Sequence, residues 1–198
     1  MTTIPNILTF SRVLSIPVIV GTFYIPFPLG IWITFGVFCA AALTDFLDGW
    51  LARHLDQITR FGQIFDPIAD KLLVATTLIL LLADSRISEV AVVTILTREI
   101  FVAGIRESLA KNISIPVSKL SKWKTAGQLI AIAILLLSPA VSNEENNPLQ
   151  LTGESLLWVV AIITWITALP YMKTAHQNLS KKLKNNHQIS VNGKDIND

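Results

Sequence analysis

Four of the aspartates within positions 45–70 have the type and spacing of ligands for divalent cations, namely Asp45, Asp48, Asp66 and Asp70. Asp45 and Asp48 are three residues apart. Asp66 and Asp70 are four residues apart, so each pair would share one face of a helix. Because the connection between the pairs is short, the two helices would be antiparallel neighbours and the four carboxylates could meet. Oxygen ligands favour Mg²⁺ or Mn²⁺ over Zn²⁺, and two such ions between carboxylates are a recurrent device of phosphoryl chemistry.

The alternative for acidic pairs at helical spacing is a solvated helix face, which is what they form in most soluble proteins. This chain is 52% hydrophobic and only 15% charged, whereas soluble domains carry roughly 25% charged residues. Carboxylates at the ends of such apolar segments are favourable mainly where they face water or a metal ion. The composition also argues against a disordered chain, a coiled coil and a nucleic-acid-binding module, and the single cysteine, Cys39, argues against a disulfide framework.

The elements that position the aspartates are predicted to be membrane-spanning helices, each of which needs about 20 mostly apolar residues. Residues 125–143 and 155–172 contain no charged residue, and neither does the longer stretch 13–44, which the Pro- and Gly-rich turn 25–30 divides. Two further apolar segments carry ionisable residues, which usually face a bundle interior or a wet cavity. We predict an all-α, polytopic membrane protein with six transmembrane helices at about 8–25, 31–53, 61–83, 89–109, 125–143 and 155–172.

The two ends of the chain are predicted to lie outside the core of the bundle. Residues 2–11 predict a short N-terminal interfacial helix that leads into the first span. The N-terminus lacks the basic region of a cleavable signal, and Pro5 and Arg12 interrupt its apolar run, so we expect no removed leader. The polar, Asn-rich residues 178–198 predict a mobile cytoplasmic tail, which leaves residues 1–177 as the membrane domain.

Basic residues are distributed unevenly between the two sides of the predicted bundle. With six spans both termini lie on one side, and that side collects nearly all the Lys and Arg residues of the loops, whereas the opposite loops hold only Arg86. Loops rich in Lys and Arg stay in the cytoplasm. The distribution predicts that the termini and the four aspartates lie on the cytoplasmic side of the inner membrane.

Four cations are candidates for binding a second anionic group. Arg98 and Arg106 are eight residues apart, or about 80° around a helix, and could face one cavity. The alternative is internal pairing with one of the two glutamates that directly follow them. Lys122 and Lys124 begin the fifth span, where they could equally be orientation signals. Metals and cations at one depth would suit two phosphate-bearing substrates.

The spacing of the aspartates resembles the signature of the CDP-alcohol phosphatidyltransferase family. The residues that carry the resemblance are Asp45-x2-Asp48-Gly49-x2-Ala52-Arg53-x8-Gly62-x3-Asp66-x3-Asp70. Residues 4–12, 65–71, 98–100 and 122–125 are similar to the members that use sn-glycerol 3-phosphate as the acceptor alcohol. The resemblance extends from about Ile4 into the sixth span and leaves out the polar tail.

This resemblance implies a six-span, often dimeric bundle that transfers the phosphatidyl group of CDP-diacylglycerol to sn-glycerol 3-phosphate and releases CMP. Two divalent ions, Mg²⁺ or Mn²⁺, would be bound by Asp45, Asp48, Asp66 and Asp70, and Asp70 would also be the general base. The residues implied to contact the CDP portion are Asn6, Thr9, Gly49, Arg53 and Thr59. Those expected to contact the acceptor phosphate are Arg98, Arg106, Lys122 and Lys124.

Other functions stay open on the sequence alone. The nearest is the same reaction with another acceptor, such as inositol phosphate, serine or phosphatidylglycerol, although Arg98 and Arg106 favour a phosphorylated acceptor over serine. A divalent-cation transporter would use the carboxylates as an ion path, but no matching acidic set is predicted across the bilayer. A purely structural membrane protein would have no use for clustered carboxylates. The expected partners are the two substrates, the lipid bilayer and a second copy of the chain, without nucleic acid.

Overall fold

The computed structural model describes residues 4–54, 60–110, 119–142 and 147–192, without side chains at several helix ends, including 45–54, 119–122 and 178–192. Every regular element in these ranges is helical, which confirms the all-α fold class for the described residues. The elements are α1 (Ile4–Phe23), α2 (Leu29–His54), α3 (Arg60–Ala83), α4 (Glu89–Ala110), α5 (Lys119–Leu137), the 3-10 helix η1 (Ser138–Ala140) and α6 (Pro148–Asn192).

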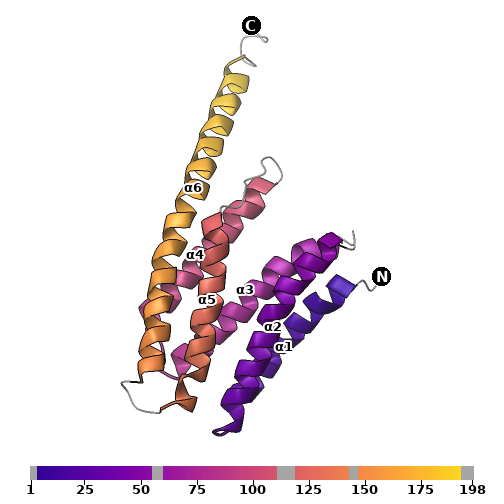
Figure 1. The fold of residues 1–198 in the computed structure, drawn as a ribbon. Coiled ribbons are helices and arrows are strands. Elements are labelled where there is room, and N and C mark those ends of the chain that lie inside the picture. Colours follow the sequence, from indigo (N-terminus) through magenta and orange to yellow (C-terminus); the bar gives the residue numbers. More distant parts are fainter. Residues whose placement is uncertain (1–3, 55–59, 111–118, 143–146, 193–198) are drawn as a thin grey trace.

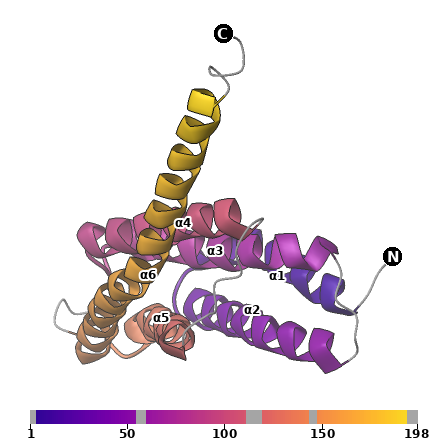
Figure 2. The ribbon, with the colours of Figure 1, turned by 90° about the horizontal axis from the view of Figure 1, so that it is seen from above.

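Consecutive helices run in opposite directions, so the chain passes back and forth through one bundle (Figure 1). The start of α1, the end of α2 and the start of α3 lie at the same end of the molecule. α1 packs against both α2 and α3, which have little direct contact with each other, and α6 packs against α4 and α5. Figure 2 shows α1 and α2 on one side and α5 and α6 on the other. The two helices that carry the aspartates are antiparallel, as expected, but they are held together mainly through α1.

Apolar side chains fill the interior and also cover the outside of the bundle. The interior contains the fully buried residues Ile19, Phe38, Leu78, Ile95 and Leu135. On the outside, Ile100 of α4 is 71% exposed and Ile162 of α6 is 60% exposed, and every helix from α1 to α6 has exposed large apolar residues. Extended apolar surfaces are rare on soluble monomers, whereas a lipid environment favours them.

Within the described part of the chain, three helical segments are long and apolar enough to cross a bilayer, at Asn6–Phe23, Trp123–Ala140 and Pro148–Ala175. The apolar part of α2, Leu29–Thr44, is shorter. α3 and α4 have 24 and 22 residues and carry ionisable groups among their apolar ones. The helices thus agree with a membrane protein, and the assignment of all six as spans stays a prediction.

The structure corrects two expectations about the ends of the chain. α1 runs without a break from Ile4 to Phe23, so the residues expected to form a separate interfacial helix are its first turns. Pro5 fits there because the first turn of a helix does not use its N–H groups. α6 continues as helix to Asn192, where a mobile tail is expected. Residues 171–192 are polar but contain no Pro or Gly that would end a helix.

α5 and α6 approach each other closely at Gly153 of α6. A Cβ atom at this position would lie 2.7 Å from Cγ of Leu135 on α5, whose side chain is fully buried. The missing side chain at position 153 therefore permits the close packing of these two helices.

Candidate active site

Asp66 and Asp70 lie one turn apart near the start of α3, and both side chains are half-buried. The hydroxyl group of Thr9 on α1 donates a hydrogen bond to Oδ1 of Asp66. Thr9 is only 1% exposed and Asp66 is half-buried, so this bond is partly shielded from water. The packing of α1 on α3 thus joins a residue expected to contact the CDP portion to a residue expected to bind metal.

A second polar cluster is centred on Glu99 of α4. Oε1 of Glu99 forms an ion pair with Nζ of Lys124 on α5 and accepts a hydrogen bond from Nη1 of Arg98 at 3.0 Å. Lys124 is 5% exposed and Arg98 is 4% exposed. Cations buried between apolar helices are unfavourable without a counter-charge, and Glu99 supplies one to both.

Arg98 also connects α4 to α6. Its Nε donates a hydrogen bond to the carbonyl oxygen of Thr164 at 2.7 Å, and its Nη2 donates one to Oγ1 of Thr167 at 2.8 Å. All three guanidinium nitrogens therefore have partners inside the protein. For this arginine the structure favours the alternative of internal pairing over an open contact with a substrate.

A cavity of about 40 Å³ lies between α3, α4 and α5 and borders both clusters. Its polar lining consists of Asp70, Lys71, Glu99, Lys124, Thr125 and Gln128. The expected general base and one of the cations expected to bind the acceptor phosphate thus face the same space. A cavity of this volume has room for water-sized groups, so it could admit only the end of a substrate.

Arg106 lies apart from this cavity. Its side chain is exposed, and its guanidinium carbon is 5.9 Å from the centre of the Tyr171 ring on α6, which is a cation–π contact. Eight residues of α4, or about 12 Å along the helix, separate Arg106 from Arg98. The sequence predicts that Arg98 and Arg106 could face one cavity. In the structure Arg98 is buried, whereas Arg106 is exposed and lies outside the cavity.

The remaining predicted residues are described only in part. Asp45, Asp48, Gly49 and Arg53 belong to the last turns of α2, at the end of the bundle where α3 begins (Figure 1), but these side chains are not described. The same holds for Lys122 of α5, and Thr59 lies outside the described residues. Among the side chains that are described, no group of three or more His, Cys, Asp or Glu residues forms a metal site. The four-aspartate site stays a prediction.

The chain matches the family model described as CDP-alcohol phosphatidyltransferase over residues 2–170. It belongs to the CDP-alcohol phosphatidyltransferase family. The match runs from the start of α1 into α6 and includes every predicted site residue. Membership makes the chain an enzyme of the CDP-alcohol phosphatidyltransferase class and confirms the resemblance seen in the spacing of the aspartates.

Curated relatives of this CDP-alcohol phosphatidyltransferase cover most of its length. A CDP-diacylglycerol–glycerol-3-phosphate 3-phosphatidyltransferase of Rickettsia bellii is 46% identical over 86% of this chain and 93% of the relative. The protein of the same name from Salmonella choleraesuis is 38% identical over 89% of this chain and 96% of the relative. A cardiolipin synthase (CMP-forming) of Oryza sativa subsp. japonica is 38% identical over 90% of this chain and 59% of that longer protein.

Three charged residues of this CDP-alcohol phosphatidyltransferase lie at the site but are absent from the set chosen by sequence reasoning. Arg12 follows Thr9 by one turn and is fully buried, whereas the sequence indicates only that it interrupts an apolar run. Lys71 lines the cavity beside Asp70, and Glu99 pairs with Lys124. The signal that could have identified them is a charged residue within an apolar segment, because such residues usually face the interior.

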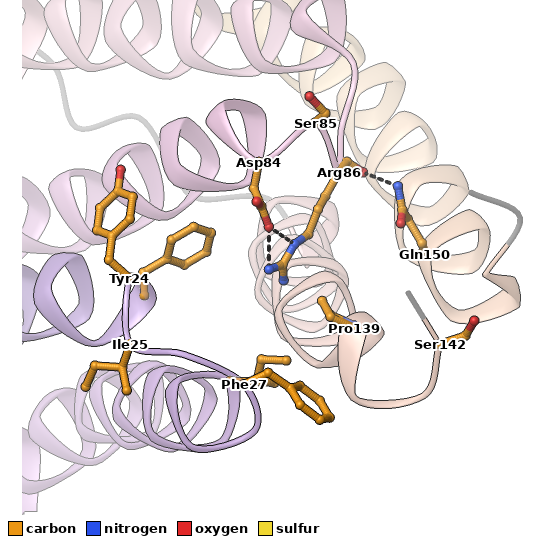
Figure 3. A pocket seen from close by; sticks show the side chains of 11 residues that line it. Tyr24, Ile25, Phe27, Asp84, Ser85, Arg86, Pro139, Ser142 and Gln150 are labelled. Carbon is orange, nitrogen blue, oxygen red and sulfur yellow. Dashed lines mark hydrogen bonds and ion pairs between the residues drawn. The ribbon is translucent and has the colours of Figure 1, made fainter. Parts of the chain in front are cut away.

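A larger cavity of about 430 Å³ lies at the opposite end of this CDP-alcohol phosphatidyltransferase and borders none of the predicted site residues whose side chains are described. Figure 3 shows Arg86 there, paired with Asp84 through Nε at 2.6 Å and Nη2 at 2.5 Å. Its Nη1 donates to the carbonyl oxygens of Leu135 and Leu136, both at 3.3 Å, and its own carbonyl accepts a hydrogen bond from Gln150. Arg86 therefore braces the turn between α3 and α4 against α5 and α6.

Proposed function

We propose that the chain transfers the phosphatidyl group of CDP-diacylglycerol to sn-glycerol 3-phosphate, which yields phosphatidylglycerophosphate and CMP. The family match gives the class of reaction, and relatives that cover nearly the same length carry this donor and acceptor in their names. The structural observation that carries the proposal is that Asp70 and Lys124 border one cavity. A base for a hydroxyl group and a cation for a phosphate thus lie together, as an acceptor that bears both groups requires.

In this reaction Asp70 accepts the proton of the acceptor hydroxyl group while the oxygen attacks the phosphorus that bears the diacylglycerol. A new oxygen–phosphorus bond forms, the bond from that phosphorus to CMP breaks, and CMP leaves with the electron pair. The residues assigned to the CDP portion are Asn6, Thr9, Gly49, Arg53 and Thr59. The position of Thr9 is fixed by its hydrogen bond to Asp66.

Two divalent ions, Mg²⁺ or Mn²⁺, belong to this proposal, with Asp45, Asp48, Asp66 and Asp70 as their ligands. The described half of the donor set fits such ions, because two half-buried carboxylates lie one helical turn apart on α3 and offer hard oxygen donors. When bound, the ions would neutralise charge on the diphosphate and on the departing CMP. The hydroxyl group of Thr9 orients the Asp66 carboxylate, as partners of metal ligands commonly do.

We assign the binding of the acceptor phosphate to four cations with different roles, Arg98, Arg106, Lys122 and Lys124. Lys124 lines the cavity and makes the direct contact. Arg98 is engaged by Glu99 and α6, so it adds positive charge from behind the cavity wall. Arg106 and Lys122 would attract the phosphate from the end of the bundle, where α4 ends and α5 begins. The contact with Lys124 would then hold the hydroxyl group in position for attack.

We also propose that all six helices span the inner membrane as a homodimer, with both termini and the aspartates on the cytoplasmic side. The alternating course of the helices supports an even number of crossings (Figure 1). The excess of Lys and Arg in the loops on the side of the termini supports the orientation. The acyl chains of CDP-diacylglycerol would stay in the bilayer while the diphosphate reaches the carboxylates at its edge.

Phosphatidylglycerol is a second candidate acceptor, favoured by the similarity to the rice cardiolipin synthase. Its phosphate is a diester with one negative charge, whereas the phosphate of sn-glycerol 3-phosphate is a monoester that carries more charge and more free oxygens. Lys124, with Arg98 behind it, suits the monoester better. Inositol phosphate also carries a phosphate monoester, so Lys124 and Arg98 do not favour glycerol phosphate over it. Only the names of the relatives favour glycerol phosphate.

The deciding experiment measures CMP release by purified protein in detergent with CDP-diacylglycerol, Mg²⁺ and one acceptor at a time. We expect release with sn-glycerol 3-phosphate and only background with phosphatidylglycerol, inositol phosphate and serine. Release with phosphatidylglycerol alone would assign the second candidate instead. If no alcohol supports release, and proteoliposomes without CDP-lipid conduct Mg²⁺, the chain is a transporter and the proposal is wrong.

A further inference from the structure

We propose that Glu99 is a positioning residue for the acceptor, because it holds the ammonium group of Lys124 at the wall of the cavity that Asp70 borders. This inference rests on the proposed function, since it takes the acceptor phosphate as the partner of Lys124. Glu99 does not react itself. It acts through Lys124, whose position decides where the phosphate binds and therefore where the acceptor hydroxyl group lies relative to Asp70.

The contacts of Glu99 support such a role. One oxygen, Oε1, pairs with Nζ of Lys124 and with Nη1 of Arg98. A lysine ammonium group has three donors, so the bond to Glu99 leaves two for a phosphate. The long lysine side chain loses rotamer freedom when it is fixed, and Glu99 has already fixed it before the acceptor arrives. The carboxylate thus organises the cation in advance.

The charges around the cavity explain why an acid belongs among the cations. Asp70 and Glu99 carry two negative charges, and Lys71, Lys124 and the adjoining Arg98 carry three positive ones, which leaves one net positive charge. The site can therefore attract an anion. It can do so without leaving a buried cation uncompensated between apolar helices, which would be costly.

The alternative is that Glu99 only fastens helices together, because Arg98 continues the network to Thr164 and Thr167 on α6. This part of the network can be cut separately. The hydroxyl group of Thr167 accepts from Arg98 and donates to the carbonyl oxygen of Thr164 at 2.9 Å. Thr167→Val removes these two bonds. It leaves the bond from Nε of Arg98 to the carbonyl oxygen of Thr164 and the pair of Glu99 with Lys124 intact.

The test compares Michaelis constants in Glu99→Gln, which keeps the shape of the side chain and removes its charge. We expect the KM for sn-glycerol 3-phosphate to rise about tenfold or more, and the KM for CDP-diacylglycerol to change by less than about twofold. Glu99→Asp keeps the charge on a side chain that is one methylene group shorter, so it should raise the acceptor KM by about two- to fivefold. Glu107→Gln makes the same change at an exposed position of α4 and should leave both constants unchanged.

Two further variants separate positioning from fastening. Thr167→Val should lower the unfolding temperature without raising the KM for the acceptor. In a Lys124→Gln background, Glu99→Gln should add little to the acceptor KM, because coupled residues give non-additive effects. An unchanged or lower acceptor KM in Glu99→Gln would overturn the inference, and so would an equal rise in Thr167→Val. If Glu99→Gln does not fold, Glu99→Asp decides, and a wild-type acceptor KM there counts against the inference.

The wild-type protein serves as the control for the underlying function. If it releases no CMP with sn-glycerol 3-phosphate, the proposed function fails and the inference falls with it. If it is active with this acceptor while Glu99→Gln binds the acceptor normally, the inference alone fails.

Discussion

Thr9 and Asp66 are 57 residues apart in the sequence, yet the hydroxyl group of one donates a hydrogen bond to the carboxylate of the other. The bond crosses from α1 to α3 and is partly buried. Because α1 also packs on α2, this contact links the helix that is proposed to hold the CDP portion to both helices that carry the aspartates. A change at Thr9 should consequently affect the nucleotide and the metal together.

Thr9→Val, which removes only the hydroxyl group, should lower kcat/KM for CDP-diacylglycerol by about tenfold, because a carboxylate loses a charge-assisted hydrogen bond. The Mg²⁺ concentration needed for half-maximal rate should rise, since Asp66 would be less well oriented. Both are measured by CMP release in titrations of lipid and Mg²⁺. Thr22→Val is the control, because Thr22 pairs with Thr34 at the other end of α1. A wild-type Mg²⁺ dependence in Thr9→Val would contradict the link.

Asp70→Asn should lower kcat by about 10²–10⁴-fold, the range expected when a general base is lost. The amount of folded protein and its unfolding temperature should stay near those of the wild type, because the side chain keeps its size. Asp84→Asn makes the same change at the opposite end, where Asp84 pairs with Arg86, and should retain turnover. If Asp70→Asn keeps a near-normal rate in saturating Mg²⁺, Asp70 is not the base.

Removal of divalent ions should abolish CMP release. After treatment with EDTA, Mg²⁺ or Mn²⁺ should restore the rate, whereas Zn²⁺ at the same free concentration should not, because the donor set consists of hard oxygens. Added Mg²⁺ should also raise the unfolding temperature of the wild type and do so less in Asp66→Asn, since ligands stabilise the state that binds them. Full activity in metal-free buffer would rule out the proposed dependence.

Arg106→Ala should raise the KM for sn-glycerol 3-phosphate by roughly fivefold and leave kcat nearly unchanged, because an exposed cation contributes modestly to binding. Arg106→Lys should retain most of the affinity. Tyr171→Leu, which removes the ring beneath the guanidinium group but no charge, is the matched control and should have a smaller effect. An unchanged acceptor KM in Arg106→Ala would take this residue out of the acceptor site.

Gly153→Ala should destabilise the bundle by about 1–3 kcal/mol, because the new methyl group would meet the buried side chain of Leu135. Gly21→Ala is the control, since a Cβ there has nothing within 4 Å, and it should be neutral or stabilising by up to about 1 kcal/mol. The measurement is unfolding in detergent by heat or denaturant. Equal stability of Gly153→Ala and wild type would argue against the close approach of α5 and α6.

Some boundaries of the helices could be predicted because they depend on neighbouring residues. The predicted spans 125–143 and 155–172, however, differ from α5 (Lys119–Leu137) and α6 (Pro148–Asn192) by six residues or more at each end. The Pro- and Gly-rich segment 25–30 predicts a break, and the structure ends α1 at Phe23 and begins α2 at Leu29. The polar residues that follow Ala83 likewise separate α3 from α4. The polar composition of residues 178–192 misled the prediction, because polarity opposes burial but does not by itself end a helix.

The partners of the buried charged side chains could not be predicted from the local sequence. A cation in an apolar helix satisfies the same local pattern whether its partner is a substrate or a carboxylate of the protein. For Arg98 the outcome depends on Thr164 and Thr167, which are 66 and 69 residues away. Lys124 is 25 residues from Glu99 and reaches it although α4 and α5 have little direct contact, because both helices pack against α6. Such partners are fixed by the packing of helices, which the local pattern does not specify.

The length of α6 has a consequence of its own. Its 45 residues correspond to about 68 Å at the usual helical rise. A bilayer with its headgroups is about 40–45 Å thick, so in the proposed six-span arrangement roughly 25 Å of this helix would extend beyond the lipid. A fluorophore attached near Asn192 would be held at a fixed height above the surface, and its distance from dye-labelled lipids would report directly on the tilt of the enzyme.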